Sequence, residues 1–227
     1  MEGSAYGLIS DSLFSDQSRG QNKAHGFFVF GACWVWRSWK WPVNLDGITD
    51  EMNVVLIGYR CSGKTAVGKT LARGLRRGFF DTDELIEETA GDSIETLVSR
   101  KGWDHFRVVE KRLIAEVSKK QNVIIATGGG VVMDDDNVRN LKHDAWVVWL
   151  KGDVEILRER MAEEQKSGRI RPSLTRAGSL DEIMEVLRLR DPLYQMAAEH
   201  TVDTGNLSVA EVAALIMRNL PQGFWRG

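Results

Sequence analysis

The sequence is poor in cysteine and in long hydrophobic runs, and neither sign of charge is in clear excess. Only two of its 227 residues are cysteines, Cys33 and Cys61, which excludes a disulfide framework and favours a reducing, cytoplasmic location. The formal net charge of −2 gives no reason to expect nucleic acid binding or a polybasic membrane anchor. The apolar run at residues 26–36 is too short to span a bilayer. The composition therefore predicts a cytoplasmic globular protein without nucleic acid or membrane partners.

The first 51 residues differ from the rest of the chain. They show neither helical nor strand periodicity, and they hold four of the eight tryptophans, Trp34, Trp36, Trp39 and Trp41. We expect residues 1–51 to be an extension outside the folded domain, with Met52 as a candidate for the true start. A Trp-rich segment that binds a membrane interface is the alternative. Residues 52–220 then form the domain, and residues 221–227 form a tail.

The most informative motif is GYRCSGKT at residues 58–65, which fits the phosphate-binding P-loop G-x-x-x-x-G-K-[ST]. A buried strand is predicted before it at residues 53–57, and a helix follows at residues 65–77, which is the context that the motif requires. Backbone N–H groups and the positive end of the new helix would face one phosphate. Lys64 could then reach the β- and γ-phosphates, and Thr65 could ligate Mg²⁺. The motif predicts a nucleoside triphosphate site.

Short apolar runs alternate with amphipathic segments from Met52 onward. Strands are predicted at residues 53–57, 78–81, 122–127, 145–150 and 200–203. Helices are predicted at residues 65–77, 83–90, 93–100, 103–120, 153–163, 179–198 and 208–219. This alternation indicates βαβ units and a parallel sheet with helices on both faces. Ligands of such sheets bind beyond the carboxyl ends of the strands.

Two acids follow the second predicted strand. Asp81 and Asp83 would point to the same side if the backbone stays extended there. One carboxylate could hold a Mg²⁺-bound water, and the other could accept a hydrogen bond from a substrate hydroxyl. Capping of the next helix is the alternative, and it accounts for one of the two acids.

Four further segments indicate a second substrate. Arg107 and Glu110, in F-R-x-x-E, can pair on one helix face. The glycines at residues 128–130 follow a strand, which suggests close approach of a ligand or a nest of N–H groups. Arg190, in R-x-P-L-Y, precedes a proline that interrupts its helix, so its side chain can turn into a site. The basic segment at residues 163–179 is either a solvated loop or a mobile lid over the triphosphate.

Taken in order, these motifs resemble the shikimate kinase family: the P-loop, F-x-D-x-D, F-R-x-x-E, GGG, R-P and R-x-P-L-Y. The resemblance covers about residues 52 to 220. It implies an adenylate-kinase-like α/β fold with a five-stranded parallel sheet in the order 2-3-1-4-5, flanked by helices and closed by a mobile lid. It also implies transfer of the γ-phosphate of ATP to the 3-hydroxyl of shikimate, a step of chorismate and aromatic amino acid biosynthesis.

The resemblance also implies roles for the matching residues. The residues expected to be catalytic are Lys64, Asp83 and Arg171. ATP is expected to contact Gly58, Cys61, Ser62, Gly63, Lys64, Thr65, Thr70 and Arg171. Shikimate is expected to contact Asp83, Arg107, Gly129, Gly130 and Arg190. Mg²⁺ is expected at Thr65 and Asp81, and Arg160 is the candidate for stacking on adenine. Cys61 departs from the family, which usually has a smaller residue there.

Two other hypotheses stay open at this point. Another small-molecule P-loop kinase, such as a gluconate or nucleoside monophosphate kinase, would explain the P-loop and the lid, although not the GGG turn or R-x-P-L-Y. A non-catalytic nucleotide-binding module would use the Trp-rich extension as its partner-binding arm, but the intact Lys64, Thr65, Asp81 and Asp83 argue against it. We expect a monomer, because no long apolar helix face is left unassigned.

Overall fold

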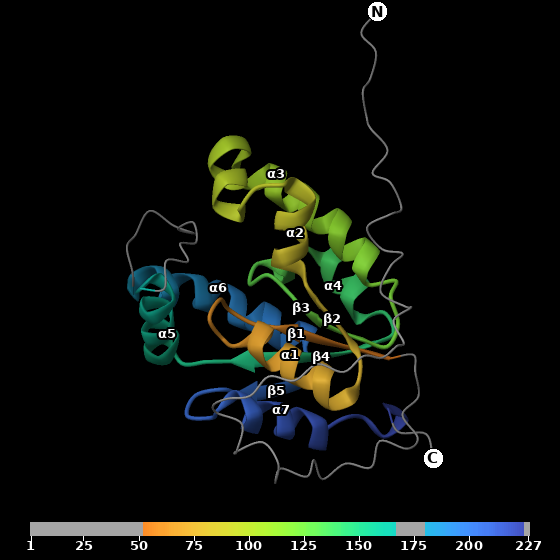
Figure 1. Cartoon of the computed structure of the whole chain (residues 1–227). Helices are drawn as coiled ribbons and strands as arrows, with labels where there is room; N and C mark the ends of the chain where they lie inside the picture. The colour runs from red at the N-terminus through yellow and green to blue at the C-terminus, as the bar shows by residue number, and fades with distance from the viewer. Residues whose placement is uncertain (1–51, 167–179, 225–227) are drawn as a thin grey trace, which may run out of the picture. The chain divides into compact units, whose positions relative to one another are not determined.

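The computed structural model describes residues 52–166 and 180–224. Residues 1–51, residues 167–179 with Arg171, and residues 225–227 lie outside the described residues. The sheet has five parallel strands, β1 (Asn53–Ile57), β2 (Gly78–Asp81), β3 (Val123–Ala126), β4 (Ala145–Lys151) and β5 (His200–Asp203). Their order is β2-β3-β1-β4-β5, which confirms the predicted order 2-3-1-4-5 (Figure 1).

Seven α-helices connect or follow these strands within the described part of the chain. They are α1 (Lys64–Leu75), α2 (Thr82–Ala90), α3 (Ile94–Val117), α4 (Asp135–Lys142), α5 (Val154–Lys166), α6 (Leu180–Ala197) and α7 (Val209–Arg218). The described part of the chain also contains two short 3₁₀ helices, η2 (Val131–Met133) and η3 (Gln222–Phe224). None of these helices is long and apolar enough to cross a membrane.

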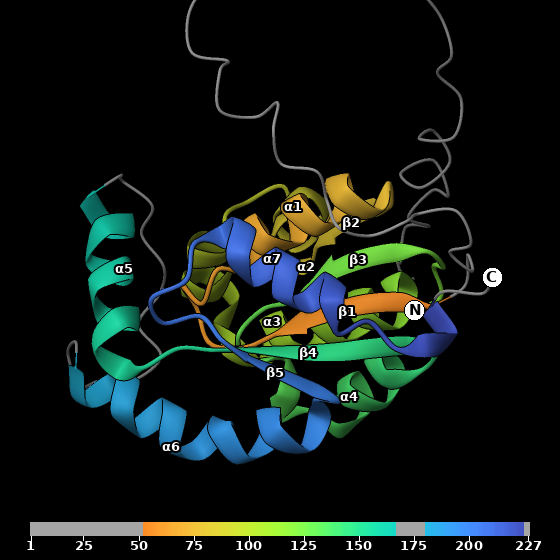
Figure 2. The ribbon, with the colours of Figure 1, turned by 90° about the horizontal axis from the view of Figure 1, so that it is seen from below.

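The two faces of the sheet carry different helices because side chains alternate along each strand. Val54 and Leu56 of β1 face a core shared with α1 and α7. Val55 and Ile57 face the opposite core, to which α3, α4 and α6 contribute. Figure 2 shows α7 and α1 in front of the sheet, with α6 and α4 beyond it. Burial on both faces explains why the strands read as continuous apolar runs.

Two smaller clusters hold helices beside the carboxyl ends of the strands. Tyr59, which follows β1, is 2% exposed and packs with Leu157 of α5 and with residues of α6. On the other side, Ile86 of α2 packs with Leu97, Phe106 and Leu113 of α3. These clusters place α5 at one flank of the strand ends and α2 with α3 at the other (Figure 1).

The predicted helices at residues 93–100 and 103–120 form one continuous element with a kink. Gly102 has φ +83° and ψ 167°, so α3 contains a break at the position where the sequence predicts one. Sequence reasoning missed α4. Its signals are present nonetheless, since Asp134 caps the helix and Arg139 and Lys142 lie in its last turn.

The packed part of the chain reaches into the predicted C-terminal tail. Phe224 is fully buried in the core beneath α1 and α7. The guanidinium carbon of Arg77 lies 3.9 Å from the centroid of the Phe224 ring. The domain boundary predicted at residue 220 therefore falls four residues short of a core aromatic side chain.

Replacing this ring tests how much the C-terminal segment contributes to stability. Phe224→Ala is expected to lower the free energy of unfolding by about 3–5 kcal/mol, because a fully buried aromatic ring leaves a cavity. Urea denaturation measures the change. The control is Met196→Ala, whose side chain is 70% exposed and whose effect should stay within about 0.5 kcal/mol. Equal midpoints for the two variants would show that residue 224 is not part of the core.

Candidate active site

The P-loop at residues 58–65 follows β1 and leads into α1, as the motif requires. Gly58 has φ +142°, and a Cβ there would lie 2.5 Å from the carbonyl oxygen of Leu150. Gly63, the residue before α1, has φ +94°. Both positions therefore need glycine. Cys61 also has a positive φ, +60°, which is unusual for a residue with a side chain.

Lys64 is held inside this loop. Its ammonium group donates to the carbonyl oxygens of Gly58 at 2.9 Å and Tyr59 at 2.7 Å. Lys64 is only 8% exposed. The loop carbonyls thus hold the ammonium group of Lys64 in the P-loop, where it could bind a phosphate.

Asp81 has two tasks at once. One oxygen, Oδ1, accepts from the backbone N–H of Asp83 at 3.0 Å and caps α2. The other, Oδ2, accepts from the hydroxyl of Thr65 at 2.6 Å. The backbone does not stay extended through Asp83, because α2 begins at Thr82. The helix turn brings Asp83 to the same pocket as Asp81 by another route.

A pocket of about 270 Å³ lies over the P-loop and the start of α2. It is lined by Cys61, Gly63, Lys64, Thr65, Ala66, Asp81, Asp83, Thr127, Arg160 and Glu164. The pocket therefore joins the P-loop, the ends of β2 and β3, and α5. Among the described residues, no group of three His, Cys, Asp or Glu side chains could hold a metal ion by itself.

Charged side chains crowd the first and third of the three glycines after β3, and P-loop backbone crowds Gly129 between them. A Cβ on Gly128 would lie 2.7 Å from Oδ1 of Asp83 and 3.2 Å from Oε1 of Glu110. A Cβ on Gly130 would collide with both terminal nitrogens of Arg107. None of the three glycines has a positive φ. The GGG sequence is explained by space for these side chains and for the P-loop backbone rather than by its own backbone conformation.

Arg107 and Glu110 form the predicted pair on α3, with Nη1 of Arg107 2.5 Å from Oε2 of Glu110. Glu110 is 1% exposed, and its other oxygen has no hydrogen-bond partner among the described residues. Burial raises the pKa of Glu110, and the nearby charge of Asp83 adds to the rise. The charges of Arg107 and Arg190 act in the opposite direction.

Arg190 and Tyr194 of α6 reach the same turn from another side. Nη1 of Arg190 donates to the carbonyl oxygen of Gly129 at 3.0 Å, and the hydroxyl of Tyr194 donates to that oxygen at 2.5 Å. Arg107, Arg190 and Asp83 therefore meet around three consecutive glycines. Two guanidinium groups and one carboxylate thus lie against the glycines at the end of β3.

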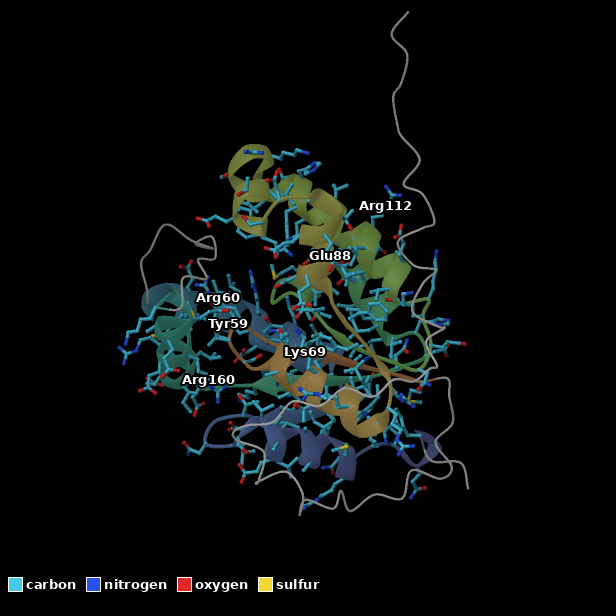
Figure 3. All side chains as sticks on the ribbon, in the orientation of Figure 1. Tyr59, Arg60, Lys69, Glu88, Arg112 and Arg160 are labelled. Carbon is cyan, nitrogen blue, oxygen red and sulfur yellow. The ribbon has the colours of Figure 1, made fainter. Side chains whose placement is uncertain are left out.

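Two residues of α5 line the pocket and are tied to other elements. Arg160 donates to the carbonyl oxygen of Thr204 at 2.8 Å and to its hydroxyl at 3.2 Å. The thiol of Cys61 donates to Oε2 of Glu164 at 3.0 Å. Figure 3 shows Arg160 on α5, with Tyr59 and Arg60 on the neighbouring P-loop. Cys61 thus connects the P-loop to the end of α5.

Comparison with known proteins gives a consistent result. The shikimate kinase family model matches residues 60–221. The shikimate kinase of Syntrophus aciditrophicus is 40% identical, with 74% of this chain and 91% of that protein covered. The shikimate kinase of Nitratidesulfovibrio vulgaris is 42% identical, with 68% and 87% covered. The chain belongs to the shikimate kinase family.

Solved structures of shikimate kinases are similar as well. The enzyme from Acinetobacter baumannii in complex with shikimate has a TM-score of 0.69 and 30% identity, and the match covers 75% of this chain and 96% of that one. The enzyme from Aquifex aeolicus has a TM-score of 0.64 and 31% identity, with 74% and 96% covered. The fold is therefore that of the shikimate kinase family.

The structure gathers most of the residues that the shikimate kinase motifs predict, but not all. Thr70 lies one turn beyond Ala66 on α1, and its hydroxyl donates to the carbonyl oxygen of Ala66. Like Gly58 and Ser62, Thr70 does not line the pocket, and the contact of these three residues with ATP stays a prediction. Arg171 lies outside the described residues.

Sequence reasoning missed three hydroxyl residues around the glycine turn. The backbone N–H of Gly128 donates to the hydroxyl of Thr82, which is fully buried. The hydroxyl of Thr127 donates to the carbonyl oxygen of Leu56. Tyr194 stood in a quoted motif but received no task. The positions of the two threonines could have indicated their roles, since Thr82 lies between the two aspartates and Thr127 directly precedes the glycines.

The raised pKa of Glu110 predicts a pH-dependent contribution to stability. Because the pKa of Glu110 is higher in the folded state, protonation of this carboxyl stabilises the folded protein. This contribution to the free energy of unfolding is complete below the ordinary pKa of 4.5, and it is lost as the pH rises through the folded-state pKa. Glu110→Gln cannot titrate. The free energy of unfolding of the wild type minus that of Glu110→Gln should therefore decrease from about pH 4 to about pH 8.

Urea denaturation at each pH measures this difference. The matched control is Glu116→Gln, the same substitution at a carboxylate of α3 that is 43% exposed. A difference that stays constant or increases with pH would show that burial does not raise the pKa of Glu110.

Proposed function

We propose that this chain transfers the γ-phosphate of ATP to the 3-hydroxyl of shikimate. The observation that carries the proposal is the position of Asp83. This residue lines the pocket that contains Lys64 and Thr65, and its Oδ1 also lies against Gly128 at the acceptor side. One carboxylate therefore stands where the phosphate donor and a hydroxyl-bearing acceptor would meet.

The acceptor side suits a small hydroxylated carboxylic acid. Arg107 and Arg190 present two planar guanidinium groups, which bind a carboxylate through paired hydrogen bonds. Glu110 holds Arg107 from behind at 2.5 Å, so its orientation is set before the acceptor arrives. Gluconate and nucleoside monophosphate kinases, the alternative hypothesis, would leave this pair of arginines and the GGG turn without a purpose.

The donor side suits a triphosphate with Mg²⁺. The hydroxyl of Thr65 and the carboxylate of Asp81 are oxygen ligands that touch at 2.6 Å in the pocket. Mg²⁺ is usually held by one or two such groups together with substrate phosphates and waters. When bound, it would neutralise charge on the β- and γ-phosphates. Thr65 would hold it directly, and Asp81 would hold one of its waters.

The remaining steps follow from the residues around Asp83. Asp83 accepts the hydrogen bond of the 3-hydroxyl and takes its proton as the oxygen attacks the γ-phosphorus. The new O–P bond forms while the bond to the β-phosphate oxygen breaks and ADP leaves. Lys64 stabilises the charge on the transferred group, and we assign the same task to Arg171 of the lid. Positioning and charge, rather than covalent catalysis, carry the reaction.

The other predictions accompany this activity as proposals. The catalytic unit comprises the residues from Met52 onward, now extended to Phe224 because that ring is part of the core. The family match at residues 60–221 supports this extent. We keep the monomer and the cytoplasmic location as predictions from the sequence.

The activity is tested with a panel of acceptors. We expect ADP release from ATP and Mg²⁺ to depend on shikimate, with neither gluconate nor AMP able to replace it. A coupled assay measures ADP, and phosphorus NMR identifies the product as a phosphate monoester. ADP release with gluconate or AMP but not with shikimate would decide for the alternative kinase. ATP binding without turnover on any acceptor would decide for a non-catalytic module.

A second prediction concerns the space beside Gly130. Gly130→Ala is expected to raise the KM for shikimate by about 10-fold or more, because the new Cβ displaces Arg107 and removes a charge-assisted hydrogen bond. The backbone tolerates alanine there, since φ is −102°. The KM for ATP should change by less than about twofold, because the P-loop is not touched.

The matched control is Gly78→Ala at the start of β2, far along the strand from the site, where the nearest atom to a new Cβ is in the side chain of Val123 at 3.3 Å. Its shikimate KM should match that of the wild type. An unchanged shikimate KM in Gly130→Ala would contradict the role of Arg107 in acceptor binding.

A further inference from the structure

The carbonyl oxygen of Gly129 accepts two hydrogen bonds, and the two donors differ in what else they must do. The hydroxyl of Tyr194 donates at 2.5 Å, and Nη1 of Arg190 donates at 3.0 Å. The donors are one turn apart on α6, so they reach the same oxygen from one helix face. Of these two donors, only Arg190 is also assigned to binding the acceptor by the proposed function.

Tyr194 approaches the carbonyl from inside the protein. Its side chain is fully buried, and its ring stacks on Trp149 of β4 with centroids 5.7 Å apart and an angle of 27° between the planes. Arg190 is only partly buried. Tyr194 is therefore a fixed donor, whereas the guanidinium group of Arg190 can turn toward a ligand in the site.

We propose that Tyr194 is a positioning residue for acceptor binding, which keeps the Gly129 carbonyl hydrogen-bonded when Arg190 turns to the carboxylate of the acceptor. The proposal rests on the proposed function, because it takes Arg190 as a ligand of the shikimate carboxylate. It assigns to the hydroxyl of Tyr194 a task that appears only when the acceptor binds.

The reason is the cost of leaving the carbonyl oxygen of Gly129, a partly buried residue, without a hydrogen-bond donor. With both donors present, Gly129 loses one of two hydrogen bonds when Arg190 leaves, and the oxygen stays satisfied. Without the tyrosine hydroxyl, the same movement would leave the oxygen with no donor, which opposes binding. Burial also raises the pKa of Tyr194 far above its usual value, so the hydroxyl keeps its proton and donates throughout the working pH range.

Packing alone does not account for this hydroxyl. The stack on Trp149 and the burial of the ring explain why an aromatic residue stands at position 194, and phenylalanine would serve both purposes. The hydroxyl is what distinguishes tyrosine there, and its partner is the carbonyl oxygen that Arg190 also contacts. Tyr194→Phe therefore isolates the proposed task.

The first test is the affinity of Tyr194→Phe for shikimate, measured by isothermal titration calorimetry with the full chain. We expect binding to be about tenfold weaker than in the wild type. The KM for ATP should change by less than about twofold, and kcat at saturating shikimate should fall less than the shikimate affinity. The urea midpoint should stay close to the wild-type value, because Arg190 still satisfies Gly129 in the free enzyme.

A double-mutant cycle with Arg190→Ala makes the test specific. In that background the tyrosine hydroxyl is the donor left to Gly129 both before and after binding. Adding Tyr194→Phe should then leave the shikimate affinity unchanged but lower the urea midpoint. The hydroxyl thus affects binding only when Arg190 is present, and affects stability mainly when Arg190 is absent.

Trp149→Phe serves as the packing control, because it loosens the ring stack and keeps the hydroxyl. It should lower the urea midpoint and leave the shikimate affinity near that of the wild type. Equal losses of affinity from Tyr194→Phe in both backgrounds would overturn the proposal, and so would a loss in Trp149→Phe as large as in Tyr194→Phe.

The wild type separates this proposal from the one on which it rests. If the wild type neither binds nor phosphorylates shikimate, the proposed function fails, and the task assigned to Tyr194 fails with it. If the wild type binds shikimate and Tyr194→Phe binds it equally well, only the role of Tyr194 is overturned.

Discussion

The site depends on one steric constraint, the lack of side chains at residues 128–130. Asp83 and Glu110 lie against Gly128, and Arg107 lies against Gly130, at distances that a Cβ would not allow. The same turn offers the carbonyl oxygen of Gly129 to α6. Because β3 ends here beside β1, the acceptor groups come within reach of the P-loop. A side chain at residue 128 or 130 would separate these groups.

Electrostatics divides the site into two halves that share Asp83. On the side that we assign to the phosphate donor, Lys64 is held by P-loop carbonyls, and Asp81 couples Thr65 to the cap of α2. On the acceptor side, two arginines balance the buried Glu110. Lys64, Asp81 and Arg107 each have a hydrogen-bond partner that fixes their position, which is what preorganisation for phosphoryl transfer requires.

The P-loop cysteine illustrates how a departure from the family pattern is accommodated. Cys61 takes a backbone conformation that favours glycine, and its thiol reaches Glu164 on α5. The next turn of α5 is tied to the loop after β5 through Arg160. The helix that precedes the predicted lid is therefore attached to both sides of the nucleotide pocket.

The amino-acid sequence by itself determined the five strands of the sheet, because short apolar runs alternate with amphipathic segments, and the resemblance of its ordered motifs to the shikimate kinase family predicted the strand order. It missed α4, whose strongly polar face hides its periodicity. Only the tertiary structure shows which atoms crowd residues 128–130 and that the hydroxyl of Tyr194 donates to the carbonyl oxygen of Gly129. Both depend on distances between segments that are far apart in the chain, and such distances are set by packing rather than by local sequence.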